Sequence, residues 1–306
     1  MIIIEIYGGL GNQFFQYSFA KNFAIKNNLE LKIDCLTNYN NETSILEFGL
    51  KYFNIDDKLA TIDDIRKVKY NNPNIFNKIK YKLRNKELPG KAYKISPHCF
   101  HEDPDNNNLI EYFDNLKIKK QAYISGFFQS QKYFIEIADI IKQNLILKDS
   151  AAGANLEMLN RIKSSNSISL HIRRTDYLNK ETLYLWGNIC TDEYYKNAIK
   201  YISQKVDNPT FFVFSDDIEY CKNNINPGFE TVFVDINNDI TAHEDMRLMS
   251  NCKHNIIANS TFSWWGTWLN SNPNKIVVSP PIWFNDGQEY HKKIGILCDD
   301  WIKISK

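Results

Sequence analysis

The sequence predicts an α/β protein built on parallel sheets, and two observations carry that prediction. The chain opens with a strand, a glycine-rich turn, a helix and a second strand, which is the order of a βαβ unit. From residue 168 onward, short apolar runs alternate with helical stretches of about 10–15 residues, a pattern typical of a doubly wound α/β domain. We therefore expect two α/β domains, residues 1–150 and 151–306.

The opening unit is assigned from its glycines and its apolar periodicity. Phe15, Phe19 and Phe23 recur at every fourth position, so one face of the predicted helix is apolar. Asn12 is the expected N-cap, because its side chain can accept a hydrogen bond from a free N–H of the first turn. The expected strand, turn, helix and strand occupy residues 2–7, 8–11, 12–28 and 29–34.

The later elements are assigned from apolar runs bounded by polar residues. Strands are expected at residues 122–126, 168–172, 211–214, 231–234, 255–258 and 275–279. Helices are expected at residues 130–145, 155–163, 191–206, 242–251 and 262–270. The stretch 148–154 is the best candidate for a linker between the two domains.

The composition argues against several classes of protein. Lys and Arg number 37 against 36 Asp and Glu, and a net charge of +1 argues against a nucleic-acid binder. No run of about 18 apolar residues is present, so we expect no transmembrane helix. The first residues lack the pattern of a secretory signal, so we expect a cytoplasmic protein. The six cysteines form no CxxC pair, so we expect reduced thiols and no zinc site.

Residues 66–94 form a basic segment with ten Lys or Arg against one acid, Glu87. Aromatic residues are interleaved with these charges, and the pair Pro89 and Gly90 marks a turn. The favoured interpretation is a solvated, basic helical insertion. The alternative is a surface that contacts anionic lipid headgroups or a lipid-linked glycan, which would place the protein peripherally at the inner membrane.

Residues 171–177 read His-Ile-Arg-Arg-Thr-Asp-Tyr and directly follow a predicted strand. Ligands of open α/β sheets bind outside the carboxyl ends of the strands, and an arginine fork donates two parallel hydrogen bonds to a phosphate. Arg173 or Arg174 is therefore expected to hold a phosphorylated ligand such as a diphosphate. The alternatives are a surface ion pair of the arginines with Asp176 and a buried structural role for His171.

Asp216 and Asp217 follow the predicted strand 211–214. Acids at such a strand end suit ribose hydroxyls or a base edge, and the alternative is that they cap the next helix. A metal needs further oxygen ligands at suitable spacing, and none is evident in the sequence.

Two predicted helix starts carry further candidate ligand groups. In the turn 8–11, Gly9 and Gly11 let a ligand approach the backbone closely, and the alternative is tight packing of the turn itself. Polar groups that serve either as caps or as phosphate donors begin the helix after strand 255–258; they are Asn259, Ser260, Thr261 and Ser263.

Three tryptophans, Trp264, Trp265 and Trp268, lie on the helix expected at residues 262–270. At helical spacing they are expected to be mostly core. The alternative is that an indole face packs on a sugar ring or a base.

Four segments, taken in order along the chain, resemble the α-1,2-fucosyltransferases of glycosyltransferase family 11. They are residues 8–17, 171–177, 214–217 and 258–269. Residues 171–177 are also similar to motifs of α-1,6- and protein O-fucosyltransferases. The four motifs in this order, spread across nearly the whole chain, make the resemblance specific.

The resemblance implies a GT-B-type fold, in which two Rossmann-like domains face a central cleft. Residues 1–150 would form the acceptor side and residues 151–306 would bind the GDP-sugar. The implied reaction is an inverting transfer of L-fucose from GDP-β-L-fucose to the 2-hydroxyl of a terminal β-galactoside of a glycan. The resemblance implies no required metal and no other cofactor.

The resemblance also implies a role for each matching residue. Arg173 would bind the β-phosphate of GDP, with Arg174 beside it. His171 and either Asp216 or Asp217 would lie near the guanosine. The remaining donor contacts would come from the two helix starts, at Gly9, Gly11, Asn12, Asn259, Ser260, Thr261 and Ser263.

Breaking the sugar–phosphate bond adds negative charge to the β-phosphate, which Arg173 and helix N-termini would stabilise. Inversion also needs a base to take the acceptor hydroxyl proton, and Asp176 is the expected base. Its alternative role is to hold Arg173 or Arg174 in place.

Three other functions stay open on the sequence. One is transfer with another nucleotide sugar or acceptor, and another is non-catalytic carbohydrate binding by the tryptophans. The third is a nucleotide-dependent oxidoreductase, which the missing GxGxxG motif disfavours.

Overall fold

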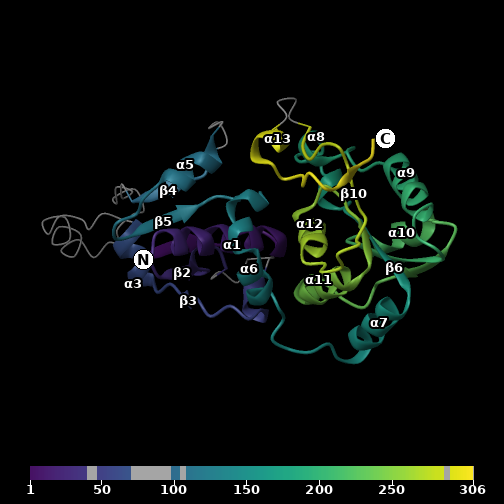
Figure 1. The fold of residues 1–306 in the computed structure, drawn as a ribbon, viewed down its shortest axis with the longest axis horizontal. Helices are drawn as coiled ribbons and strands as arrows, with labels where there is room; N and C mark the ends of the chain where they lie inside the picture. The colour runs from purple at the N-terminus through teal and green to yellow at the C-terminus, as the bar shows by residue number, and fades with distance from the viewer. Residues whose placement is uncertain (40–46, 70–97, 104–107, 286–289, 306) are drawn as a thin grey trace, which may run out of the picture.

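The computed structural model describes residues 1–39, 47–69, 98–103, 108–285 and 290–305. Within these residues the chain forms two parallel sheets that lie side by side and are flanked by helices (Figure 1). The predicted α/β architecture is confirmed. We call residues 1–150 the N-terminal half and residues 151–306 the C-terminal half.

The first sheet has the strand order β3-β2-β1-β5-β4, and all its paired strands are parallel. Its strands are β1 (Ile2–Glu5), β2 (Leu31–Asp34), β3 (Lys58–Leu59), β4 (Cys99–His101) and β5 (Ala122–Ser125). The helices of this half are α1 (Leu10–Lys26), α2 (Leu36–Tyr39), α3 (Ile62–Lys69), α5 (Leu109–Asn115) and α6 (Ala138–Asn144).

The second sheet has the order β11-β10-β9-β6-β7-β8, again with parallel pairs throughout. Its strands are β6 (Asn166–Ile172), β7 (Pro209–Ser215), β8 (Glu230–Phe233), β9 (His254–Ile256), β10 (Val277–Ser279) and β11 (Ile302–Lys303). Its helices are α7 (Gly153–Ser164), α8 (Leu183–Trp186), α9 (Asp192–Ser203), α10 (Ile218–Asn224), α11 (Ala242–Asn251), α12 (Thr261–Trp268) and α13 (Tyr290–Ile294).

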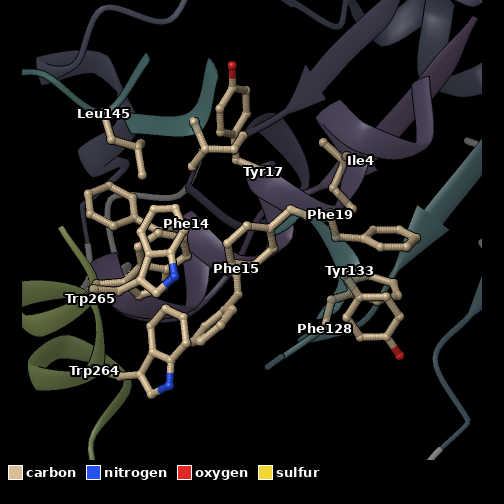
Figure 2. Close-up of a cluster of buried hydrophobic side chains, with 14 of the residues drawn as sticks. Ile4, Phe14, Phe15, Tyr17, Phe19, Phe128, Tyr133, Leu145, Trp264 and Trp265 are labelled. Atoms are coloured by element: carbon tan, nitrogen blue, oxygen red, sulfur yellow. The ribbon is translucent and has the colours of Figure 1, made fainter. Parts of the chain in front are cut away.

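One hydrophobic core joins the two halves, and α1 and α12 form its centre (Figure 2). The ring of Phe15 lies 4.5 Å from that of Trp264, and the ring of Phe14 lies 5.4 Å from that of Trp265. Both indoles are fully buried and Trp268 is 8 % exposed. The predicted core role of the tryptophans is confirmed, and Trp264 and Trp265 are not accessible to a sugar.

The first turn of α1 lies directly on the first turn of α12. A Cβ added to Gly11 would come within 2.5 Å of the Thr261 carbonyl carbon and 2.7 Å of the Phe262 nitrogen. Because α1 follows β1 and α12 follows β9, this contact makes the carboxyl edges of the two sheets face each other. The predicted domain boundary near residue 150 stays a prediction, since the shared core crosses it.

Two local predictions are wrong. The N-cap of α1 is Gly9, not Asn12, because Gly8 takes a φ of +78° and turns the chain earlier than expected. The helix predicted at 130–145 is broken into two 3₁₀ turns followed by α6. Phe134 leaves the helical region with a φ of −144°, and both it and Tyr133 are buried, so packing overrides helical periodicity there.

Three sequence expectations concern the wider chain. The basic segment 66–94 lies outside the described residues beyond residue 69, where α3 ends. All six cysteines are free thiols. In the part of the chain that the structure describes, no helix combines the length and apolar character needed to cross a bilayer.

Asp245, in the first turn of α11, provides a pH-dependent prediction. Burial raises its pKa to about 6, although a 2.7 Å hydrogen bond from Asn237 opposes the shift. The folded state therefore keeps a proton that the unfolded chain has already released, so stability falls as pH rises from about 4 to about 6. We expect Asp245→Asn to raise the free energy of unfolding by about 2 kcal/mol at pH 7.5 and about half as much at pH 5. Urea unfolding at both pH values measures this, and an equal gain at both would contradict it.

Candidate functional site

The candidate site lies at the carboxyl ends of β9, β6 and β7, which are neighbours in the second sheet. Ile172 at the end of β6 pairs with Ser215 at the end of β7. This register places Arg173, the next residue on one strand, opposite Asp216, the next residue on the other. The two predicted motifs that follow these strands therefore form one cluster.

Arg173 is held by two carboxylates. Its Nε and Nη2 donate to the two oxygens of Asp176 at 2.8 and 3.0 Å, and Nε lies 3.3 Å from Asp216 Oδ2. The guanidinium is thus fixed in orientation, with its remaining N–H groups available to an anion. Both oxygens of Asp176 are occupied by this ion pair.

Asp216 holds the backbone of the loop that carries the arginines. It accepts hydrogen bonds from the backbone N–H groups of Arg174, at 2.9 Å, and Thr175, at 3.1 Å, and from the Thr175 hydroxyl. Burial alone would raise the pKa of Asp216, but Arg173 and these donors outweigh burial and lower it. An ionised Asp216 therefore positions the loop at neutral pH.

Arg174 is directed to α10. Its Nε lies 3.3 Å from Asp217 Oδ2, and its guanidinium stacks over the Tyr220 ring at 3.3 Å. Asp217 is the N-cap of α10, where it accepts from the Tyr220 backbone N–H. The capping alternative is confirmed for Asp217.

His171 is buried near the end of β6, with 4 % of its surface exposed. Its Nδ1 has no hydrogen-bond partner among the described residues, and its ring lies 5.7 Å from that of Phe262. Burial and, next, the charge of Arg173 lower its pKa, so the imidazole is neutral at neutral pH. A neutral imidazole with an unused nitrogen can donate to or accept from a nucleoside.

Asn259 ties together three segments around the site. Its buried side-chain amide donates to the backbone carbonyl oxygens of Trp186 and Trp283, each at 3.1 Å, and the backbone carbonyl oxygen of Asn259 accepts from the Tyr177 hydroxyl at 2.8 Å. Tyr177, the last residue of the 171–177 motif, is the positioning residue that sequence reasoning missed. Its position in the 171–177 motif is the feature of the sequence that could have indicated this role.

The hydroxyls that follow Asn259 differ in availability. Ser260 caps α12 by accepting from the Phe262 backbone N–H at 3.3 Å. Ser263 is fully buried, and its hydroxyl lies 3.2 and 3.1 Å from the carbonyl oxygens of Ala258 and Ser260. Its single proton is committed within the protein, so Ser260 and Thr261 are better placed than Ser263 to meet a ligand.

The predicted residues of the N-terminal half meet the same region through α1. Gly11 packs on Thr261, and the Asn12 side chain accepts from Gln129 Nε2 at 3.0 Å. Gln13, which sequence reasoning did not single out, fixes the turn by donating to the carbonyl oxygen of Gly8 at 3.0 Å. In the described residues, no group of three or more His, Cys, Asp or Glu side chains is arranged to hold a metal ion.

We expect Asn259→Asp to lower the free energy of unfolding by about 2–3 kcal/mol, because a carboxylate would face two carbonyl oxygens in place of two donated hydrogen bonds. Asn223→Asp is the matched control, because that exposed amide donates only to the Glu219 carbonyl oxygen on the surface of α10. We expect the control to change stability by less than about 0.5 kcal/mol. Equal urea midpoints for the two variants would show that Asn259 does not hold these segments.

Comparison with known proteins identifies relatives along the whole chain. The family described as Glycosyl transferase family 11 matches residues 1–305. The α-1,2-colitosyltransferase of Escherichia coli is 33 % identical and covers 100 % of this chain and 99 % of its own length. Galactoside α-(1,2)-fucosyltransferase 1 of Saimiri sciureus is 25 % identical, and the match covers 60 % of this chain and 52 % of the length of that protein.

Among solved structures, a mutant of Arabidopsis thaliana FUT1 in complex with GDP is similar in fold. It has a TM-score of 0.51 and 12 % sequence identity, and the match covers 90 % of this chain and 69 % of that one. The GT-B-type fold implied by the sequence motifs is confirmed.

Proposed function

The chain belongs to glycosyl transferase family 11, and from that premise we propose that it transfers L-fucose from GDP-β-L-fucose to the 2-hydroxyl of a terminal β-galactoside. The observation that supports this most is Arg173, fixed by Asp176 and Asp216 at the carboxyl edge of the second sheet. An arginine held there suits the β-phosphate of a leaving GDP. The proposal includes a cytoplasmic location and no metal cofactor.

In the proposed step, the acceptor oxygen forms a bond to the anomeric carbon from the face opposite GDP. The bond between that carbon and the phosphate oxygen breaks, and GDP leaves with the electron pair. Arg173 and the N-terminus of α12 stabilise the charge on the β-phosphate, and such preorganised donors contribute about 3–4 kcal/mol each.

The acceptor hydroxyl must also lose its proton to a base. Asp176 is the carboxylate that the sequence singles out for this task, but both of its oxygens accept hydrogen bonds from Arg173. That geometry supports its alternative role, in which Asp176 positions Arg173 for the phosphate, and in the proposed step the acceptor proton then passes to solvent water.

A second candidate donor is favoured by the whole-length similarity to the E. coli α-1,2-colitosyltransferase. Colitose is the 3-deoxy analogue of fucose, so the two donors differ by one hydroxyl. A site that hydrogen-bonds this hydroxyl rejects the deoxy sugar by about 10⁴-fold or more, whereas an apolar site discriminates by only about 10²-fold. Comparing the two donors therefore identifies the substrate.

The test is release of GDP from GDP-fucose and from GDP-colitose, with and without lactose, in the presence of EDTA. We expect lactose-dependent release that persists in EDTA, faster with GDP-fucose. Faster release from GDP-colitose would assign the second candidate donor. If neither donor releases GDP and GDP itself does not bind in a calorimetric titration, the proposal is wrong.

A further inference from the structure

Glu102 directly follows β4, at the carboxyl edge of the first sheet. Its Oε2 accepts hydrogen bonds from the backbone N–H groups of Phe127, at 2.6 Å, and Phe128, at 2.8 Å. Its other oxygen, Oε1, accepts no hydrogen bond from the residues that the structure describes, and it remains accessible to solvent. The carboxylate is therefore fixed in place with one oxygen open to water.

The loop that holds Glu102 is tightly packed and strained. A Cβ added to Gly126 would lie 2.4 Å from the Cβ of Glu102 and 2.9 Å from its Oε2. Phe128 takes a φ of +50°, a conformation that few bulky residues adopt. Such strain costs about 1–3 kcal/mol and clusters at functional sites. Here the strained loop directs two successive N–H groups at one carboxylate oxygen.

Packing ties this loop to the core that the two halves share. The ring of Phe128 is fully buried and stacks on that of Phe19 in α1, with the ring centres 3.7 Å apart (Figure 2). The ring of Phe127 lies 5.0 Å from that of Tyr7, which follows β1. The segment that fixes Glu102 is thus anchored on α1 and on the end of β1.

Direct contacts also connect this loop with the proposed phosphate-binding turn. Gln129 donates at 3.0 Å to the side chain of Asn12, in the first turn of α1. Gly11 in the same turn packs on Thr261 at the start of α12. Glu102 therefore lies on the sheet edge that faces the donor site, and these contacts hold the two edges together.

The carboxylates that end or closely follow β1, β2, β6 and β7 have both oxygens in use. Each accepts hydrogen bonds or ion pairs from the protein at both positions; they are Glu5, Asp34, Asp176, Asp216 and Asp217. A base needs an oxygen that can take a proton. Among these strand-end carboxylates in the described residues, Glu102 differs by having one.

The surroundings of Glu102 suit a proton acceptor. Burial raises its pKa, and its two N–H donors oppose the rise. Burial and, next, the charge of Glu102 raise the pKa of Tyr7, so the phenol that faces the carboxylate stays neutral. The other titratable groups on the adjoining strand ends are Glu5, paired with Lys69, and His101 and Asp103 on either side of Glu102.

We propose that Glu102 receives the acceptor proton in the proposed transfer. This inference rests on the proposed function and names the proton acceptor of its step. As the acceptor oxygen bonds to the anomeric carbon, its proton passes to a water molecule, and that water gives a proton to Oε1 of Glu102. The carboxylic acid releases this proton to bulk solvent after the product leaves, which restores the carboxylate.

The test is Glu102→Gln, which keeps an oxygen for the two N–H donors and removes the base. We expect kcat for transfer to lactose to fall about 10²-fold, because general bases contribute about 10²–10⁴-fold. The affinity for GDP, measured by calorimetric titration, should not change. The kcat of the wild type should fall on the acid side of its pH profile, measured from about pH 5 to about pH 9, as Glu102 takes up a proton. The Gln variant should lose this acid limb.

A conservative variant and a matched control complete the experiment. Glu102→Asp keeps a carboxylate, so it should retain the acid limb at a reduced rate. Glu30→Gln is the control, because Glu30 pairs with Lys58 in an exposed ion pair just before β2, at the opposite edge of the same sheet. This control should leave both kcat and the pH profile unchanged.

Two results would overturn the role of Glu102. One is a kcat for Glu102→Gln within about threefold of the wild type. The other is an acid limb that persists in Glu102→Gln or disappears in Glu102→Asp, since a carboxylate that only supports the loop would not set the pH profile. Absence of transfer by the wild type from both GDP-sugars overturns the proposed function instead.

Discussion

Replacing Arg173 with alanine is expected to lower kcat for transfer about 10³-fold. Removing one preorganised donor to a developing charge costs about 10²–10³-fold in kcat, and Arg173 presents a guanidinium with several N–H groups to the proposed β-phosphate. The loss should appear mainly in kcat, because the charge on the leaving phosphate grows in the transition state. Initial rates of GDP release at saturating donor and lactose measure it.

Two further variants separate the geometry of Arg173 from its charge. Arg173→Lys keeps the positive charge but loses the fork that pairs with both oxygens of Asp176 at 2.8 and 3.0 Å. We expect it to recover only about tenfold of the lost activity. Arg161→Ala is the control, because that half-exposed arginine pairs with Glu230 on the surface. A kcat for Arg173→Ala within tenfold of the wild type would remove Arg173 from the mechanism.

Gly11→Ala is expected to lower the free energy of unfolding by about 3 kcal/mol, because overpacking against a rigid neighbour costs about 1–3 kcal/mol or more. The added methyl carbon would lie 2.5 Å from the Thr261 carbonyl carbon, and backbone atoms cannot rotate away. The first turns of α1 and α12 would have to move apart, and this movement would loosen the shared core that Figure 2 shows. For a chain of this size we expect a fall in Tm of about 5 °C.

The adjacent glycine supplies the matched control for that prediction. Gly9 has a φ of −69°, and a Cβ placed there would meet no atom within 4 Å. Gly9→Ala should therefore change the Tm by no more than about 2 °C. Equal Tm values for the two variants in differential scanning calorimetry would show that α1 and α12 are not in contact at Gly11.

A separation of α1 from α12 should also reduce transfer. Gly11 packs at the N-terminus of α12, where Ser260 and Thr261 are the proposed phosphate ligands. If the Gly11→Ala protein remains folded at 20 °C, we expect its KM for the donor to rise more than its kcat falls. This follows because the ligand groups move while Arg173, on another loop, stays in place.

The sequence by itself determined the architecture and the strand ends at which the candidate site residues lie. Strand ends are marked by a change from apolar to polar residues within a few positions, so the loops at Arg173, Asp216 and Asn259 could be placed from local pattern. The core role of Trp264 and Trp265 also followed from helical spacing. These features depend on residues that are close together in the chain, and a single sequence shows such local patterns directly.

Only the tertiary structure decided which polar groups are free to act. Asp176 and Ser263 match the motifs equally well, yet the oxygens of Asp176 are occupied by Arg173 and the hydroxyl of Ser263 is committed to backbone carbonyls. The contact of Gly11 with Thr261 joins residues far apart in the chain. Burial and partner choice depend on such long-range packing, and local residue patterns do not encode it.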